Sequence, residues 1–411
     1  MSSRLPHRAM SLPLVALIAA ACFEPSTAPT SARGPAINAQ VTRGAWELAG
    51  APSSPGWQQR ARELAAASNL SPLAAARVYA ALSVAQYRAV QAIDDSDVDG
   101  QLPAKGIGSG GRSALEAHRG AVAGASAQVL SFFFPAAVAS LEQRVTMEGA
   151  AGPGGVHPQF ARGLAIGRSA GDALAQWARN DRFTTPWTGT VPTGPGMWIA
   201  NGPPAGATFG GVRPYLLASG DQFRPPPPPA FGSDAFTRDL NEIQTLSSTR
   251  TAAQLASALY WNFPTGTFTP PGYWNLVAAN YVAAFALDER AATRTFALMH
   301  AAMMDALIGC WDAKYYYWTI RPSQDDTRIT LTFGLPNHPS YPSGHSCVSA
   351  AAATVLSELF PERTTELDTW VTDAGLSRMY AGIHYGFDIT AGRDLGEAVA
   401  RWAIEHAGLL E

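Results

Sequence analysis

The sequence predicts an all-α protein built from one or more helical bundles. Apolar residues recur at helical spacing over long segments, and no segment of useful length alternates between apolar and polar residues as a half-buried strand would. The 411 residues are 47% hydrophobic and 15% charged, which is enough apolar material for a sizeable core. We therefore expect packed helices through most of the chain.

The first 22 residues have the pattern of an export signal. Basic residues precede an apolar run from Leu12 to Ala21, which is too short to span a bilayer as a stable helix. Cleavage near Ala21 and lipidation of Cys22, as in a bacterial lipoprotein, are both compatible with this pattern. Residues 23–42 are rich in Ser, Thr, Ala, Pro and Gly and are expected to form a flexible tether. We expect an exported protein that is periplasmic, attached to the outer envelope or extracellular.

Helical patterns follow the tether. Ser71-Pro72 combines a capping residue with a first-turn proline, and it precedes helical spacing from Leu73 to Ile93. Further helices are predicted at about residues 112–133, 160–179 and 235–246. The segment 273–317 is rich in Ala, Met and aromatic residues and is also predicted to be helical.

Residues 180–233 interrupt the helical pattern. Gly, Pro and Trp punctuate this segment, and no helix interior tolerates the run Pro225 to Pro229. A long ordered excursion or a lid is one interpretation, and a plain surface connection is the other. On this basis we divide the mature chain into an N-terminal helical region, 43–232, which includes the excursion, and a helical catalytic region, 233–411.

A weak internal repeat links the two regions. Arg77-Val-Tyr-Ala, followed by two spaced alanines, resembles Arg294-Thr-Phe-Ala with the same alanines after it. The repeat suggests two related bundles, although alanine-rich helices also resemble one another by composition alone.

Composition excludes several classes of function. A formal charge of −3 provides no general attraction to nucleic acid or to an acidic membrane surface. No segment after the signal is long and apolar enough to be a membrane span. Beyond Cys22, Cys310 and Cys347 are too few for a disulfide-rich scaffold, so we expect buried thiols, with a single bridge as the alternative. The oligomeric state stays open.

Four short signals lie in order within the last hundred residues. Each is weak alone, because a single Lys or Arg is usually a solvated charge and a single His is usually a satisfied core residue. Their joint order and spacing favour a functional site. The signals are Lys314 with Arg321-Pro322, Pro342-Ser343-Gly344-His345, Ser377-Arg378, and His384 with Asp388.

The cationic residues among these predict an anion site. Lys314, Arg321 and Arg378 are three cations in a slightly acidic chain, and the planar fork of arginine suits two oxygens of an oxyanion. Ser343-Gly344 opens an apolar run that is expected to be helical. The Ser343 hydroxyl and the Gly344 N–H would then lie at a helix N-terminus, which attracts anions.

The two histidines supply the reactive groups. His384 can present one ring nitrogen to the central atom of an oxyanion, while Asp388, four residues later, holds the other ring N–H. His345 can act as a general acid or base. A zinc site is disfavoured because neither histidine has companion ligands at the usual spacings.

Together these motifs resemble the three-part signature shared by vanadium-dependent haloperoxidases and the type-2 phosphatidic acid phosphatase superfamily. The resemblance covers roughly the last quarter of the chain, and the soluble haloperoxidase-like branch is the closer match. It implies that His384 bonds the vanadium of vanadate, or phosphorus, and that His345 is the acid–base residue. It also implies that the oxyanion oxygens are held by Lys314, Arg321, Ser343, Gly344 and Arg378.

The resemblance leaves two reactions open. With vanadate as the cofactor, the enzyme would oxidise a halide with hydrogen peroxide to hypohalous acid. As a soluble acid phosphatase, it would form a phosphohistidine on His384, and His345 would protonate the leaving alkoxide of a phosphomonoester. A non-catalytic oxyanion-binding protein is a third alternative, but it would not need His345.

Flanking residues favour the peroxidase. Trp311 and His338 resemble positions that line the halide side in haloperoxidases, and His338 resembles bromide-oxidising members; for Trp311, a core aromatic is the alternative. Tyr385-Gly386 departs from the Trp-Arg pair often found there in haloperoxidases, which leaves the halide preference open. A carboxylate that orients His345 is expected upstream of it.

Overall fold

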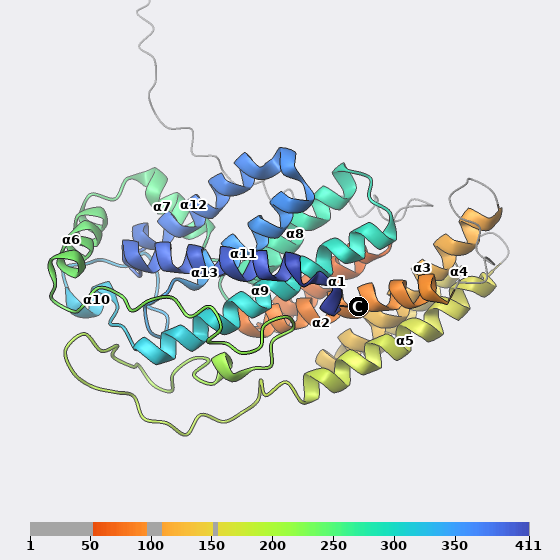
Figure 1. The fold of residues 1–411 in the computed structure, drawn as a ribbon, viewed down its shortest axis with the longest axis horizontal. Coiled ribbons are helices and arrows are strands. Elements are labelled where there is room, and N and C mark those ends of the chain that lie inside the picture. The colour runs from red at the N-terminus through yellow and green to blue at the C-terminus, as the bar shows by residue number, and fades with distance from the viewer. Residues whose placement is uncertain (1–51, 97–108, 151–154, 411) are drawn as a thin grey trace, which may run out of the picture. The chain divides into compact units, whose positions relative to one another are not determined.

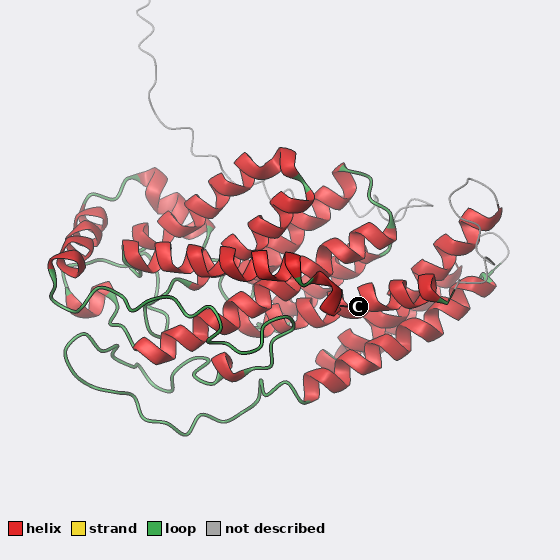
Figure 2. Ribbon diagram, viewed as in Figure 1, coloured by secondary structure: helices red, strands yellow, loops and turns green. Residues whose placement is uncertain are grey.

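The chain folds into helices joined by loops over the residues that the computed structural model describes, which are 52–96, 109–150 and 155–410. Two isolated bridges are the sole extended pairings in these ranges, and the predicted all-α fold is confirmed (Figure 2). The predicted export signal and tether lie outside the described residues. The α-helices are α1 (Ser54–Ala67), α2 (Pro72–Asp95), α3 (Ser109–Phe133), α4 (Val138–Ala150), α5 (Pro158–Arg179), α6 (Asp234–Ser248), α7 (Ala252–Tyr260), α8 (Thr269–Ala284), α9 (Glu289–Tyr317), α10 (Pro322–Asp325), α11 (Gly344–Leu359), α12 (Thr364–Tyr380) and α13 (Gly386–Glu405). Short 3₁₀ helices are η1 (Pro135–Ala137), η2 (Phe209–Gly211), η3 (Pro361–Arg363) and η4 (Ala407–Leu410).

Helix starts follow the capping signals in the sequence. The Ser71 hydroxyl accepts the N–H of Ala74 at 3.3 Å, and Pro72 occupies the first turn of α2. Helices α3, α5 and α6 likewise begin within three residues of their predicted starts. Sequence patterns did not predict α1, α4, α7, α12 or α13.

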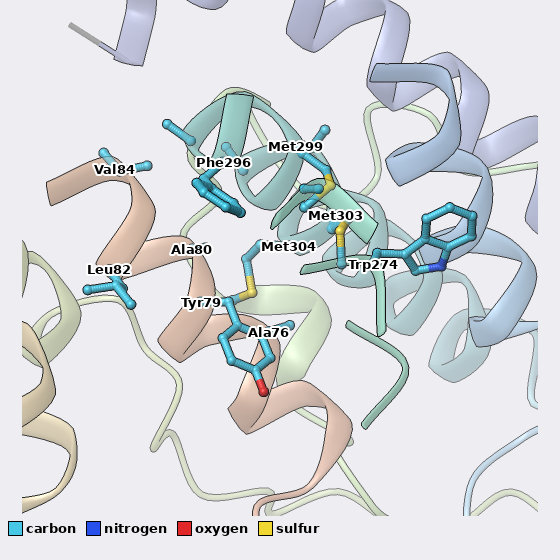
Figure 3. Close-up of a cluster of buried hydrophobic side chains, with 14 of the residues drawn as sticks. Ala76, Tyr79, Ala80, Leu82, Val84, Trp274, Phe296, Met299, Met303 and Met304 are labelled. Atoms are coloured by element: carbon cyan, nitrogen blue, oxygen red, sulfur yellow. The ribbon is translucent and has the colours of Figure 1, made fainter. Parts of the chain in front are cut away.

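Helix α9 is the centre of the core. It packs against α2, α8, α11 and α13, as the ribbon shows (Figure 1). In the cluster of Figure 3, Met303 and Met304 of α9 lie among Tyr79 of α2 and Trp274 of α8. Each such fully buried side chain stabilises the fold by roughly 1.5–3 kcal/mol. The helix that carries Lys314 is therefore firmly held.

Helices α3 and α5 pack against each other without side chains between their closest points. A Cβ atom added at Gly163 would lie 2.0 Å from the carbonyl oxygen of Ala117, and one at Gly167 would lie 2.0 Å from that of Ala121. Such distances require glycine because any larger residue would overlap the backbone of the opposite helix. The contact keeps the helix pair at backbone distance.

The predicted excursion, residues 180–233, is bound to α9 at several points. The Asp305 carboxylate accepts the backbone N–H groups of Tyr215, Leu216 and Leu217 at 2.7–3.0 Å. Arg224 forms a two-pronged ion pair with Asp312 at 2.6 and 3.0 Å. The segment is therefore an ordered excursion rather than a loose surface connection.

The two halves of the weak internal repeat lie on α2 and α9, which pack directly against each other. The predicted division at 232/233 stays a prediction. No helix within the described ranges has the length and apolar character needed to cross a membrane.

Candidate active site

The four sequence signals meet in one region of the structure. Their residues come from the end of α9, the loop after it, the start of α11, the end of α12 and the start of α13. His345 lies within electrostatic reach of Arg378 and Lys314. His384 lies within electrostatic reach of Arg321, Lys314, His338 and His345.

Two turns bring Arg321 and His384 into position. Helix α9 ends at Tyr317 because Trp318 adopts a left-handed conformation with φ 53°, and the chain then returns toward Arg321. After α12, Gly382 takes φ +78°, which glycine adopts without strain, and the chain turns back to His384. Both turns place a functional side chain just beyond a helix end.

His384 is held between an acceptor and a donor. Its Nδ1 lies 2.7 Å from Asp388 Oδ2, and its Nε2 lies 3.1 Å from Nη1 of Arg321. Because a carboxylate accepts and a guanidinium donates, Nδ1 carries the hydrogen and Nε2 carries the lone pair. Burial lowers the pKa of His384 well below its ordinary value, and the Arg321 and Lys314 charges lower this pKa further. The ring is neutral and presents a lone pair, as a nucleophile or ligand requires.

Asp388 accepts more donors than the sequence indicates. Besides His384, the Ser340 hydroxyl donates to Oδ2 at 2.5 Å and the Tyr385 N–H donates to the same oxygen at 3.1 Å. Burial raises the pKa of Asp388 to about 6, against the Ser340 hydrogen bond and the Lys314 and Arg321 charges. Ser340 is fully buried and was not predicted, because it lies outside the recognised motif.

His345 is oriented by a backbone carbonyl. Its Nε2 lies 2.8 Å from the carbonyl oxygen of Trp261, just after α7. Since a carbonyl can only accept, Nε2 carries the hydrogen and Nδ1 is left with the lone pair in the neutral ring. Burial and the Arg378 charge lower the pKa of His345 well below its ordinary value. The prediction that an upstream carboxylate orients His345 is therefore wrong, because the backbone carbonyl of Trp261 makes this contact.

Lys314 is fully buried and bound to the loop before α11. Its Nζ donates to the carbonyl oxygens of Pro339, Ser340 and Pro342 at 2.9, 2.7 and 2.5 Å. Burial lowers its pKa to about 8. Three acceptors satisfy all three ammonium hydrogens, so contact with an anion requires Lys314 to exchange one carbonyl for an anion oxygen.

The two arginines are buried and held largely by neutral acceptors. Arg321 donates to the carbonyl of Ile383 at 2.6 Å and to that of His338 at 3.1 Å. Arg378 donates to Ser377 Oγ at 2.9 Å and to the carbonyl of Ala258 at 2.7 Å. Burial lowers the pKa of Arg321 to about 10 and that of Arg378 to about 9.

The charges of this group do not balance. It contains three buried cations, whereas Asp388 is the carboxylate that the structure brings to them. The cost of burying unpaired charge is large unless a counter-ion is present. The arrangement therefore favours the binding of an anion.

The start of α11 forms the predicted helix N-terminus. Ser343 caps this helix through a 3.4 Å contact with the N–H of Ser346, and its own N–H donates to the carbonyl of Asp388 at 2.9 Å. Gly344 is the first helical residue, and a Cβ there would lie 3.1 Å from the Trp311 ring. The Ser343 hydroxyl and the first-turn N–H groups of α11 provide neutral donors for an anion.

Trp311 and His338 lie together beside the cations. Their ring centroids are 5.1 Å apart, and Lys314 Nζ lies 5.6 Å from the centroid of the Trp311 ring. His338 Nδ1 accepts a hydrogen bond from Nη2 of Arg321 at 3.0 Å. The Trp311 indole donates to the carbonyl of Ala205 at 3.2 Å, so the excursion supplies a wall of the site. Trp311 is buried, but it is also in direct contact with the site.

Cys310 and Cys347 are buried free thiols, as expected, and they lie next to each other within electrostatic reach of Lys314. Within the described part of the chain, no group of three or more His, Cys, Asp or Glu side chains could hold a metal ion.

Comparison with known families and proteins agrees with the motifs. Residues 294–407 match the PAP2 superfamily. Non-specific acid phosphatases of Salmonella typhimurium and Salmonella typhi are each 39% identical to this chain over 88 residues, which is 20% of this chain. The match covers 35% of each phosphatase, so the chain spans about a third of the length of these relatives.

Solved structures resemble a much larger part of the chain. A bacterial vanadium-dependent iodoperoxidase superimposes with a TM-score of 0.70 and 25% identity, covering 85% of this chain and 95% of that protein. The apo and holo forms of a bacterial vanadium-dependent chloroperoxidase superimpose with TM-scores of 0.66 and 0.64 at 16% identity. These two cover 83% of this chain and 95% and 93% of theirs, and at that identity they indicate a shared fold.

Proposed function

We propose, from the match of residues 294–407 to the PAP2 superfamily, that the protein is a vanadium-dependent haloperoxidase. In this proposal vanadate is the cofactor, and hydrogen peroxide oxidises a halide, with bromide favoured, to hypohalous acid. The observation that carries the proposal is the excess of buried cations around a neutral His384, whose Nε2 lone pair accepts an N–H of Arg321.

The residues present fit an oxyanion. Lys314, Arg321 and Arg378 supply positive charge that Asp388 alone does not neutralise. The N-terminus of α11 adds the Ser343 hydroxyl and the Gly344 N–H, which would contact further oxygens. His384 Nε2 would bond the central atom once Arg321 turned its N–H toward an anion oxygen.

Bound vanadate would supply a Lewis-acidic centre that activates peroxide. The protein's own part is to hold charge and move protons. Lys314 and the two arginines bind and orient the anion, and His345 can accept a proton from peroxide at Nδ1 because Trp261 holds its other nitrogen. Asp388 keeps the hydrogen of His384 on Nδ1.

The extent of the structural similarity supports the peroxidase over the phosphatase. The likeness to the iodoperoxidase covers most of both chains, whereas the phosphatase match covers 88 residues. Trp311 and His338 beside the cations also support a halide side. We favour bromide because of His338, and the iodoperoxidase makes iodide the next halide to test.

A soluble acid phosphatase is the second candidate, and the 39% identity to non-specific acid phosphatases specifically favours it. In that reaction His384 Nε2 would attack phosphorus to form a phosphohistidine, and His345, once its Nδ1 has taken up a proton, would give that proton to the departing alkoxide. A non-catalytic oxyanion-binding protein is the third candidate, and the placement of His345 at the site argues against it.

Parallel assays of the purified protein test the proposal. One follows halogenation of an organic dye with orthovanadate, peroxide and either bromide or iodide, and the other follows hydrolysis of a nitrophenyl phosphate. We expect halogenation that depends on vanadate, is lost in His384→Ala and is kept in His406→Ala, whose ring stacks on Trp402 at 3.7 Å. Phosphate ester hydrolysis without halogenation would reverse the order of the two candidates.

We further propose that the protein is exported, with either signal cleavage near Ala21 or a lipid anchor on Cys22. Cell fractionation of the full chain and of Cys22→Ser distinguishes these outcomes. A lipoprotein would move from the membrane fraction to the soluble fraction in the variant, and retention of both forms in the cytoplasm would contradict export.

A further inference from the structure

Ser340 connects three parts of the site that lie on different elements. Its N–H donates to the carbonyl of Thr319 at 3.0 Å, just beyond α9, and its own carbonyl accepts Lys314 Nζ at 2.7 Å. Its hydroxyl donates to Asp388 Oδ2 at 2.5 Å, in the first turn of α13. The residue is fully buried, so water does not compete for these bonds.

The Ser340 hydroxyl determines how the Asp388 carboxylate is held. Oδ2 accepts Ser340, His384 and the Tyr385 N–H, while Oδ1 is buried with no hydrogen-bond partner among the described residues. His384 and Tyr385 belong to the same short segment as Asp388, whereas Ser340 approaches from the loop before α11. Ser340 is therefore the donor that ties the carboxylate to the rest of the site.

We propose that Ser340 is a positioning residue whose hydroxyl, acting through Asp388, sets the orientation and tautomer of the His384 ring. This inference rests on the proposed oxyanion function of the site. Without the hydroxyl, the carboxylate is held by its own segment alone and can rotate about its last bond. The hydrogen on His384 Nδ1 then loses its fixed acceptor, and the lone pair on Nε2 is directed by its contact with Arg321 alone.

Calorimetric titration of the vanadate-free full-length protein with orthovanadate tests the proposal, because it measures the binding affinity. Ser340→Ala is expected to weaken binding roughly 10- to 100-fold, the usual effect of removing a group that orients a ligand. Ser340→Thr keeps a hydroxyl and is expected to restore most of the affinity. Ser349→Ala is the matched control, because this buried serine on α11 accepts the Trp274 indole at 3.0 Å, and its loss is expected to leave the affinity unchanged.

A spectroscopic measurement separates positioning from a general structural effect. Nitrogen-15 NMR of the His384 ring is expected to report hydrogen on Nδ1 in the wild-type protein and in Ser349→Ala. In Ser340→Ala the same signals are expected to show a mixture of the two tautomers. The NMR measurement needs no ligand and does not use Ser340→Thr. It therefore tests Ser340 even if Ser340→Thr does not fold because the larger side chain lacks space.

A double-mutant cycle tests whether Ser340 acts through Asp388. In an Asp388→Ala background, Ser340→Ala is expected to change orthovanadate affinity by much less than in the wild type. An equal loss in both backgrounds, or an unchanged tautomer in Ser340→Ala, would overturn the proposal. If the wild-type protein binds no orthovanadate, the proposed function fails, and the tautomer measurement still decides the role of Ser340.

Discussion

Burial controls the protonation of the histidines at the site. The pKa values of His338, His345 and His384 all lie well below the ordinary histidine value, because the rings are buried and close to cations. All three are neutral at pH 7. His345 can therefore act as a base, and His384 keeps its lone pair, without either needing to lose a proton first.

Removal of His345 and removal of His384 should have different effects on turnover and on orthovanadate affinity. His345→Ala is expected to lower turnover by about 10²–10⁴-fold, the usual contribution of a general acid or base, while orthovanadate affinity stays close to that of the wild type. His384→Ala is expected to lose both, because it removes the bond to the central atom. Steady-state kinetics and calorimetry measure the two quantities. A fall in affinity in His345→Ala as large as the fall in turnover would contradict the assigned roles.

The buried His300, which lies away from the site, is expected to make the fold less stable in acid. Burial lowers its pKa to about 3, with the Arg62 charge adding to the effect and the Phe296 carbonyl opposing it. An unfolded histidine titrates near 6.5, so between these values the unfolded chain binds the extra proton. The contribution of a neutral His300 is complete above about pH 6.5 and is lost as the pH falls toward 3.

Comparison with His300→Gln isolates this effect, because glutamine does not titrate. Between pH 7 and pH 4.5 the free energy of unfolding of the wild type should fall by roughly 2–3 kcal/mol more than that of the variant. Urea unfolding at the two pH values measures the difference. Equal losses in both proteins would show that His300 does not contribute to acid sensitivity.

At the scale of helices, the α3–α5 contact depends on missing side chains. Gly163→Ala gains about 1 kcal/mol of helix propensity, but its Cβ would meet the Ala117 carbonyl oxygen at 2.0 Å. Because that atom is backbone, a whole helix must shift, and overpacking of this kind costs about 1–3 kcal/mol or more. The net expectation is a lower melting temperature.

Gly211→Ala provides the control, because nothing lies within 4 Å of the added atom. Its unfolding free energy should change by no more than about 0.5 kcal/mol. Thermal unfolding of both variants measures the contrast. A Gly163→Ala protein as stable as the wild type would mean that the two helices can separate freely.

Sequence reasoning predicted side chains of the site but not the backbone groups that hold them. Lys314, Arg321, His345 and His384 stand in motifs, so residue type and spacing were enough to select them. The carbonyls of Ala258 and Trp261 hold Arg378 and His345, yet every residue has a carbonyl and none marks itself in the sequence. They come from α7 and the residue after it, a short helix that sequence patterns did not predict.

Helices with a cap and an amphipathic pattern were easier to predict than helices without them. Helices α2 and α5 each combine a cap, a first-turn proline and an amphipathic pattern. Helix α12 has no side-chain cap, and its apolar residues do not gather on one face. Its existence depends on packing against α7 and α11, which no local pattern reports.

For the whole molecule, the uncompensated charge at the site predicts that an anion stabilises the fold. Orthovanadate present at about 100 times its dissociation constant should add about 2.7 kcal/mol to the free energy of unfolding. Thermal unfolding with increasing orthovanadate measures this gain. His384→Ala should gain less, and an equal gain in that variant would place the anion elsewhere.

The proline run in the excursion also affects how this protein can associate with other polypeptides. Residues 225–229 carry no amide hydrogen, so they cannot supply the donors that a β-ladder needs. Two of their carbonyls accept hydrogen bonds. The Tyr317 hydroxyl donates to the carbonyl of Pro225 at 2.7 Å, and the Tyr341 hydroxyl donates to that of Pro226 at 2.6 Å. This part of the excursion is thus protected against strand addition and amyloid-type association. The same stretch is silent in amide deuterium exchange, so its motions must be followed through those two tyrosines.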